Sequence, residues 1–527
     1  EKKQLLKKAS ELLGAEEACI VMTMDDMLKK QELVQEKTIK KINAEGNLIE
    51  AVYLPPFYFA EIGVEGKLKK LATSPATDRL WRGLMKARAE SGNETLSVNV
   101  ETIEKKAGMI YDEVQRNAIR QAAASKVMIL TGGPGTGKTT IIRCILDAMQ
   151  ENGYAVELAA PTGRASKRMT EATGNEARTI HRLLEYIPGE GFQRNRDNPL
   201  IVDMVIIDEM SMVDAPLMYA LLQAIPKGTR LVLVGDRDQL PPVGCGNVFS
   251  DALSSGVLPY FRLTEIFRQA QRSNIVRNAH LINSGKMPVL TDRDSDFLFE
   301  EIPNTNRIRA RLVELILKES SSLGTSDPLM DLQVLVPMKS GPLGVVELNR
   351  LLQDVCNPPS PLKAEHTFGN TVFREGDKIM QIRNNYKVEW RKAQKQGGYE
   401  EGLGVFNGDL GTILRIDTRE KYAVIAFDDG RTAEYAFAQF EEIDLAYCIT
   451  IHKSQGSEFR TIILPLAGGP IPLLTRNLLY TAVTRAKHLV YGIGKSETIA
   501  RMVKNAQRSE RNTGLKERLA EYAVSGS

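Results

Sequence analysis

The feature that most constrains the fold is a glycine-rich segment at 131–140, with the sequence TGGPGTGKTT. It matches the pattern G-x-x-x-x-G-K-[ST] at Gly132, Gly137, Lys138 and Thr139. The apolar run 127–130 precedes it and a helical stretch follows, which excludes a simple glycine-rich turn. Glycines let backbone N–H groups point at phosphate oxygens, and the next helix N-terminus favours negative charge. The segment therefore predicts a nucleoside triphosphate site at the end of a buried strand.

The residues of this loop have distinct expected roles. The Lys138 ammonium reaches the β- and γ-phosphates of ATP, and the Thr139 hydroxyl binds Mg²⁺. We therefore expect ATP and Mg²⁺ as ligands. The remaining nucleotide contacts are expected from Gly133, Gly135, Thr136, Gly137 and Thr140.

Two later segments supply polar side chains after apolar strands. In 203–209 (DMVIIDE), Asp208 is expected to hold the Mg²⁺ and Glu209 to polarise the attacking water. In 235–243 (GDRDQLPPV), Gln239 can sense the γ-phosphate, because an amide both donates and accepts hydrogen bonds. An acidic turn and a proline-stiffened turn are the alternatives for each segment taken alone.

Short aliphatic runs alternate with helical segments in two blocks of the chain. The first block has runs at 127–131, 155–160, 203–207 and 230–234, and the second at 332–336, 444–451 and 461–466. Strands that alternate with helices predict parallel sheets covered on both faces. We therefore expect an α/β enzyme with two lobes.

Three regions depart from this alternation. Residues 1–100 predict an α-rich domain, with helices at 1–13 and 60–71 and a strand at 49–54. The Gly- and Pro-containing stretch 187–199 predicts a hairpin or loop. Residues 370–440 have short strands separated by Gly, Asn and Asp turns, which predicts an antiparallel barrel inserted in the second block.

Composition excludes some classes of protein. No apolar run is long enough to span a membrane, and the five cysteines are scattered without a C-x-x-C pair. We expect reduced thiols in a cytoplasmic protein, with neither a disulfide framework nor a structural zinc site. The net charge of +3 neither requires nor excludes a nucleic-acid partner. The first residue is Glu1 rather than Met, which leaves open that an upstream domain is missing.

A larger set of ordered segments resembles the motifs of superfamily 1 helicases, in particular those of the RecD-like branch. The matching segments are YDEVQRNAIRQA (111–122), GGPGTGKTT (132–140), APTGRASKRM (160–169), TIHRLL (179–184), VIIDEMSM (205–212), GDRDQLPPV (235–243), LTEIFRQA (263–270), VPMKSGPLG (336–344), ITIHKSQGSEF (449–459) and LLYTAVTRAK (478–487). Longer family members carry helix–hairpin–helix repeats near the N-terminus, and the sequence 1–100 has no such pattern.

The resemblance implies a domain organisation. It implies an α/β fold of two RecA-like P-loop lobes with parallel sheets, a small Src-homology-3-like (SH3-like) β-barrel insertion and an α-rich N-terminal domain. The N-terminal domain is expected at 1–104 and the first lobe at 105–265, with a pin insertion at about 186–200. The second lobe is expected at 266–368 and 441–527, with the barrel at 369–440.

The resemblance also implies roles in the nucleotide site. Gln115 resembles the glutamine that reads adenine, and Glu458 resembles a residue that contacts the ribose or assists the site. Arg268 and Arg485 resemble the arginines that the second lobe presents to the γ-phosphate, where a planar cation stabilises the transition state. Either arginine taken alone would be assigned to a surface ion pair.

Other matching positions are implied to hold the DNA strand without reading its sequence. Phe192 in the pin could stack on a base, with Arg194 and Arg196 near phosphate, and a passive loop is the alternative. Asn384, Asn385 and Tyr386 in the insertion are interpreted as turn residues rather than contacts. The strand-holding residues are Thr162, Arg164, His181, Thr450, His452, Lys453 and Ser454.

These expectations point to a monomeric, ATP-dependent DNA helicase that acts in repair or recombination. The resemblance implies 5′-to-3′ movement on single-stranded DNA and separation of duplexes with a 5′ overhang. Two alternatives remain open at this point. One is a single-strand translocase or RNA-directed ATPase, because phosphate-holding residues do not distinguish DNA from RNA. The other is a non-enzymatic scaffold with a decayed nucleotide site, which the intact set of site residues argues against.

Overall fold

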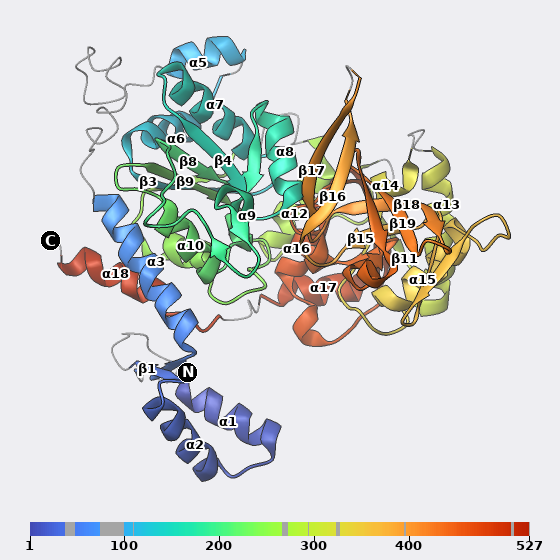
Figure 1. Ribbon diagram of the computed structural model, residues 1–527, viewed down its shortest axis with the longest axis horizontal. Helices are drawn as coiled ribbons and strands as arrows, with labels where there is room; N and C mark the ends of the chain where they lie inside the picture. Colours follow the sequence, from blue (N-terminus) through green and yellow to red (C-terminus); the bar gives the residue numbers. More distant parts are fainter. Residues whose placement is uncertain are drawn as a thin grey trace.

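The computed structural model describes residues 1–36, 48–73, 100–108, 110–265, 272–292, 295–322, 327–394, 397–506 and 511–525 (Figure 1). Two parallel sheets with flanking helices form the main body of the molecule, and an antiparallel sheet lies beside the second of them. No helix in the described ranges is long and apolar enough to cross a membrane.

The first lobe is built on a six-stranded parallel sheet in the order β10-β3-β9-β8-β4-β5. The strands β3, β8 and β9 are buried along their whole length because helices cover both faces of the sheet. The bounds are β3 (Val127–Gly132), β4 (Val156–Ala160), β5 (Ala177–Thr179), β8 (Met204–Ile207), β9 (Arg230–Gly235) and β10 (Tyr260–Leu263).

Alternate residues of β3 enter different hydrophobic cores. Met128 and Leu130 pack with α6 (Glu113–Ala124) and α7 (Lys138–Glu151). Val127 and Ile129 pack with α10 (Ala215–Ala224) and α11 (Val248–Ser255) on the opposite face. This alternation follows from the two-residue period of a strand. The loop at 131–140 therefore leaves a strand that is fixed from both sides.

The second lobe has a five-stranded parallel sheet in the order β11-β24-β23-β12-β22. The strands are β11 (Phe297–Glu301), β12 (Leu332–Val336), β22 (Cys448–Thr450), β23 (Phe459–Leu466) and β24 (Ala486–Gly494). The flanking helices include α12 (Asn274–Asn283), α13 (Thr305–Ser322), α15 (Val345–Cys356), α16 (Arg476–Val483) and α17 (Ser496–Lys504).

The predicted insertion is a seven-stranded antiparallel sheet in the order β17-β16-β20-β19-β18-β15-β21. It extends past the predicted end at 440, because β21 (Ile443–Leu445) pairs with β15 (Lys378–Gln381). The Lys378 ammonium donates to the backbone oxygens of Leu329 and Leu332, which joins this sheet to the second lobe. The other strands are β16 (Asn385–Ala393), β17 (Tyr399–Val405), β18 (Leu410–Asp417), β19 (Tyr422–Phe427) and β20 (Arg431–Ala436), and β13 (Glu365–Phe368) and β14 (Thr371–Arg374) form a separate hairpin.

Helices near both ends of the chain pack against the first lobe, although the predicted ranges assign them to the N-terminal domain and to the second lobe. Within 1–104, α1 (Lys2–Leu13) and α2 (Glu17–Lys29) project from the body, whereas α3 (Pro55–Thr73) packs on α10 and buries Val64 and Leu68 in the first-lobe core (Figure 1). Within 441–527, α18 (Leu515–Ser525) packs against α3 and α11 of the first lobe. The reason is that Leu515 and Leu519, one helical turn apart, are buried in the same core.

Candidate functional site

The phosphate loop joins β3 to α7 and has the backbone that its glycines permit. Gly135 and Gly137 have φ values of 71° and 84°, in the left-handed region that other residues avoid. The Thr136 hydroxyl donates to the oxygen of Gly133 at 2.9 Å, and Lys138 Nζ donates to the oxygens of Gly132 and Gly133 at 2.6 and 3.0 Å. Lys138 therefore lies across the mouth of the loop.

Other residues predicted in this loop differ in exposure. Thr139, in the first turn of α7, is exposed, and Thr140 is partly buried. Thr139 is thus accessible to a ligand bound in front of the helix N-terminus.

Two buried carboxylates follow β8 and face this loop. The Asp208 side chain accepts a hydrogen bond from the backbone N–H of Glu209 at 2.8 Å, and both residues are less than 10% exposed. Glu209 has φ 53° and ψ 39°, a conformation that costs on the order of 1–3 kcal/mol for a residue other than glycine. Such strain is typical of functional positions.

The environment of the two carboxylates separates their pKa values. Burial, followed by the nearby Glu209 charge, raises the pKa of Asp208. Burial opposes ionisation of Glu209 as well, but Arg168 and then Arg485 outweigh it and lower the pKa of Glu209. Glu209 is therefore held as a carboxylate, the form that accepts a proton from water.

The segment that carries Gln239 is attached to the second lobe. Tyr480 on α16 donates to Asp236 Oδ2 at 2.6 Å, the Leu240 N–H donates to the Thr481 hydroxyl at 3.2 Å, and Asn477 donates to the oxygen of Gln239 at 3.4 Å. A movement of α16 would therefore be transmitted to Gln239.

Among the buried polar atoms at this junction, Gln239 Oε1 and Arg485 Nε have no hydrogen-bond partner among the described residues. Arg485 is 2% exposed, and its Nη1 donates to the oxygen of Ser457 at 3.2 Å. Buried polar atoms normally have partners, so these two are positioned for a ligand or water.

Gln115 lies beside the loop, with both ends of its amide engaged. Its oxygen accepts from the Asp112 N–H at 3.1 Å as part of a helix capping box, and its Nε2 donates to the oxygen of Thr136 at 3.4 Å. Contact with adenine would require an exchange of these bonds. Arg268 falls at a position outside the described residues.

Glu458 lies against Arg168 rather than against the phosphate loop. Arg168 donates to Glu458 Oε1 at 2.6 Å and to Glu209 Oε1 at 2.6 Å, and Lys487 Nζ lies 3.5 Å from Glu458 Oε2. The sequence alone gives no role for Arg168, although its segment, 160–169, resembles a helicase motif. Its position between Glu209 and Glu458 depends on the packing of the second lobe against the first.

The residues present fit ATP with Mg²⁺. The loop provides backbone donors and a cation, and the two unpartnered atoms of Gln239 and Arg485 suit phosphate or water. No group of three or more His, Cys, Asp or Glu side chains in the described part of the chain could hold a metal by itself. Mg²⁺ at Thr139 and Asp208 would therefore take its other ligands from phosphate and water, as this ion usually does.

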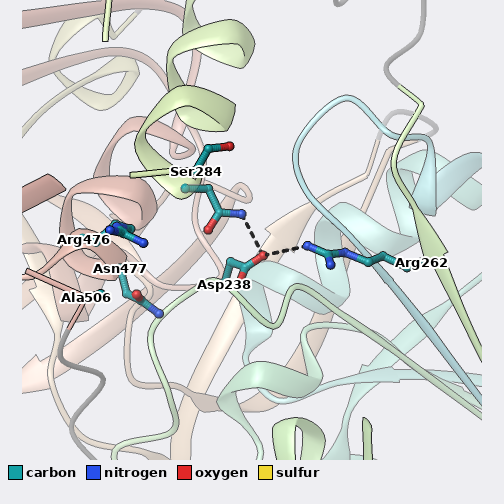
Figure 2. A pocket seen from close by; sticks show the side chains of 7 residues that line it. Asp238, Arg262, Ser284, Arg476, Asn477 and Ala506 are labelled. Carbon is teal, nitrogen blue, oxygen red and sulfur yellow. Dashed lines mark hydrogen bonds and ion pairs between the residues drawn. The ribbon is translucent and has the colours of Figure 1, made fainter. Parts of the chain in front are cut away.

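A pocket of about 280 Å³ lies between the lobes, beside this junction but away from the phosphate loop (Figure 2). Asp238 stands between Asn283 Nδ2, at 2.8 Å, and Arg262 Nη2, at 3.9 Å. The pocket shares the segment 235–243 with Gln239. Its lining residues are Asp238, Arg262, Asn283, Ser284, Arg476, Asn477 and Ala506.

The predicted strand-holding residues divide by exposure. Thr162 and Thr450 occupy equivalent positions as N-caps of α8 (Gly163–Thr173) and of the short helix Ile451–Ser454. His452 is exposed, but Ser454 is fully buried and donates to the oxygen of Ile451, so it does not face a strand.

The predicted cations of this surface already have anionic partners. Arg164 forms an ion pair with Asp428 in the turn between β19 and β20, and Lys453 Nζ lies 3.4 Å from Asp444 Oδ2. A nucleic-acid phosphate at either position would compete with a carboxylate.

The predicted pin is a short hairpin of β6 (Tyr186–Ile187) and β7 (Gly191–Phe192). Phe192 does not point freely outward: its ring centroid lies 5.5 Å from that of His181 and 4.9 Å from that of Tyr186. Burial lowers the pKa of His181. Arg194 pairs with Glu185 at 2.8 Å rather than standing free.

The same aromatic cluster reaches the antiparallel sheet. The rings of Tyr186 and Tyr386 lie 5.4 Å apart between centroids. Asn384, directly before β16, accepts from the Asn407 N–H, whereas Asn385 is the first residue of β16 and donates to Glu442, so Asn385 is a strand residue rather than a turn residue. Tyr386, interpreted in the same way, instead joins the hairpin to the insertion.

Comparison with known proteins identifies matching families in three parts of the chain. The AAA domain family matches residues 115–245, the ATP-dependent RecD-like DNA helicase SH3 domain family matches 348–427, and the UvrD-like helicase C-terminal domain family matches 445–492.

Two curated relatives support the same family assignment. The ATP-dependent RecD2 DNA helicase of Deinococcus radiodurans is 35% identical over 469 residues, which cover 89% of this chain and 58% of that protein. The RecBCD enzyme subunit RecD of Mycobacterium tuberculosis (strain H37Rv) is 33% identical over 451 residues, which cover 78% of this chain and 73% of that protein. The chain thus spans little more than half the length of the RecD2 relative.

Among solved structures, the Pif1 helicase from Candida albicans is similar at 18% identity and a TM-score of 0.44, over 80% of this chain and 100% of that one. That similarity adds nothing to the assignment, which rests on the sequence relatives and the family matches. By these, the chain belongs to the RecD-like family of superfamily 1 DNA helicases.

Proposed function

We propose that this chain is an ATP-dependent DNA helicase that moves 5′ to 3′ on single-stranded DNA and separates duplex DNA. The observation that carries the proposal is the junction of the two lobes at the nucleotide site. The backbone oxygen of Gln239 accepts a hydrogen bond from Asn477 on α16, and Arg485 follows the same helix. A site assembled from both lobes can link hydrolysis to lobe movement.

Each residue of the site has a defined task in this proposal. Lys138 and the loop backbone hold the phosphates, and Glu209 accepts the proton of the attacking water. Arg485 stabilises charge that develops on the γ-phosphate oxygens. Thr139 and Asp208 would hold Mg²⁺, which when bound neutralises charge on the phosphates.

The finer parts of the proposal rest on the relatives. One is named an ATP-dependent RecD2 DNA helicase and the other a RecBCD enzyme subunit. A role in DNA repair or recombination is proposed from the RecD-like resemblance. The 5′-to-3′ direction is proposed from the RecD-like resemblance. We further propose that the chain acts as a monomer in the cytoplasm.

The test is a strand-separation assay with DNA and RNA duplexes that carry either a 5′ or a 3′ overhang. DNA with a 5′ overhang should be separated in the presence of ATP and Mg²⁺, and DNA with a 3′ overhang should not. Separation of the 3′ substrate alone would refute the direction. Strand-stimulated hydrolysis without separation of any duplex would support a translocase, and separation of RNA alone would support an RNA-directed enzyme.

Substitution of the loop lysine tests the site itself. Lys138→Ala should abolish hydrolysis, because it removes the ammonium that holds the β- and γ-phosphates, while single-strand binding should largely persist. Arg143→Ala, on the same helix with its side chain 63% exposed, is the control and should retain activity. Hydrolysis by Lys138→Ala would contradict the site assignment.

A further inference from the structure

Arg168 on α8 lies between carboxylates that belong to different lobes. Its Nη2 donates to Glu209 Oε1 and its Nη1 to Glu458 Oε1, each at 2.6 Å. The Arg168 side chain is 26% exposed, that of Glu209 6% and that of Glu458 30%. One planar cation thus bridges the proposed general base of the first lobe and a residue of the second.

The contact fixes the direction of the Glu209 carboxylate. A guanidinium is planar and always charged, so it orients a carboxylate more strictly than a lysine does. Glu209 is buried and its backbone is in the left-handed region, so its side chain leaves β8 in a constrained direction. A base that is misplaced by 1 Å can cost about 100-fold in rate.

Glu458 moves with the second lobe. It directly precedes β23 in the parallel sheet and follows Ser457, whose oxygen accepts from Arg485. Lys487 on β24 holds the other oxygen of Glu458, at 3.5 Å. The contact of Arg168 Nη1 with Glu458 therefore ties Arg168 to the start of β23 and to β24, the strand that Arg485 directly precedes.

We propose that Arg168 is a positioning residue for ATP hydrolysis, which takes its own position from Glu458 and thereby lets the second lobe set the direction of the Glu209 carboxylate. The inference rests on the proposed ATPase activity and adds a connection to it. Arg168 acts through Glu209 and need not touch ATP. Through Arg168 and Glu209, the second lobe acts on the attacking water. Arg485 of the same lobe acts separately, on the γ-phosphate.

The test is a double-mutant cycle of Arg168→Ala, Glu458→Gln and the two combined, with hydrolysis measured with and without single-stranded DNA. Arg168→Ala should lower kcat at least about tenfold, with the KM for ATP changed by less than about threefold, because the base rather than ATP is misplaced. Glu458→Gln should lower the stimulation by DNA. The double variant should be no slower than Arg168→Ala, because both changes break one connection.

Other outcomes would overturn the proposal. Multiplying effects in the double variant would mean that Arg168 and Glu458 act independently. A raised KM with unchanged kcat would mean that Arg168 contacts ATP. Arg143→Ala, again the exposed control on α7, should match the wild type in kcat and in stimulation by DNA.

Arg168→Lys keeps the experiment informative if the alanine variant has a lowered melting temperature. Lysine keeps the charge beside Glu209 but cannot hold both carboxylates at the same distances. In that background Glu458→Gln should have no further effect, and a further loss would contradict the connection. An inactive wild-type protein would refute the proposed function, whereas an active wild type with independent effects would refute only this inference.

Discussion

At the scale of single residues, Arg164 is one of the residues predicted to hold the DNA strand, and its guanidinium already forms an ion pair. Its ion pair with Asp428 joins the first lobe to the turn between β19 and β20. Lys167, about one helical turn after Arg164 on α8, donates to the backbone oxygen of Asp428 at 3.4 Å. A strand phosphate at Arg164 must displace a carboxylate.

We therefore expect Asp428→Asn to tighten single-strand binding. The change removes the competing charge and a source of repulsion, and a gain of about twofold to fivefold is expected from a pair of this kind. Fluorescence anisotropy at several salt concentrations measures the effect. Asp417→Asn, at the end of β18 in the same sheet and paired with Arg415, is the control. Unchanged or weaker binding would show that Arg164 does not contact the strand.

The role of a residue could be predicted from the sequence where its contacts lie within one short segment, and not where they join distant segments. Gly135, Gly137 and Lys138 could be predicted because their chemistry lies within one loop. The burial of Ser454 and the capping bonds of Gln115 depend on how each short segment folds locally. The bridge of Arg168 depends on packing across a separation of 290 residues, for which a sequence has no local pattern.

At the scale of elements, the buried strands were the easiest to predict. The apolar runs 127–131, 155–160, 203–207 and 230–234 correspond to β3, β4, β8 and β9, because parallel strands covered on both faces need apolar residues throughout. The edge strands β5, β10 and β11 were not predicted. In β10, Tyr260 and Arg262 are exposed, so its sequence has no continuous apolar run.

In the hairpin of β6 and β7, the exposed large apolar side chain is Ile187 rather than Phe192, the residue predicted to stack on a base. Ile187, directly before the turn, is 42% exposed, whereas Phe192 packs on His181 and Tyr186. We therefore expect Ile187→Ser to slow duplex separation several-fold while strand-stimulated hydrolysis changes by less than about twofold, since it removes an exposed apolar group and no buried one. A forked-duplex assay beside an ATPase assay measures both rates.

Ile201→Ser is the matched control for the hairpin, because Ile201 is 64% exposed on the same lobe but outside the hairpin. It should leave both rates unchanged. An equal loss of separation and hydrolysis in Ile187→Ser would reject a pin role for the hairpin.

At the scale of the whole molecule, the C-terminal helix ties the N-terminal segments to the first lobe. Arg518 on α18 donates to Glu36 Oε1 at 2.7 Å and to Glu61 Oε1 at 3.2 Å, and all three side chains are largely buried. The Gly514 N–H also donates to Glu61. These contacts join residues more than 450 positions apart, so no sequence pattern predicts them.

Breaking this cluster should destabilise the first lobe. Arg518→Leu leaves two buried carboxylates without their cation, and the loss of one partner from such a cluster costs about 3–5 kcal/mol. Thermal unfolding should show a midpoint lowered by several degrees. Arg501→Ala, an exposed arginine on α17, serves as the control. A midpoint equal to that of the wild type would show that α18 contributes little to the lobe.

The return of α18 to the first lobe also limits how the second lobe can turn. The chain leaves the first lobe after β10 and comes back to it before α18, so the second lobe is attached at two separate places. A body attached at one point can rotate about any axis, whereas one attached at two points rotates freely only about the line between them. A lobe whose preceding and following segments both pack in the first lobe has fewer ways to turn relative to it than a lobe joined at one end only.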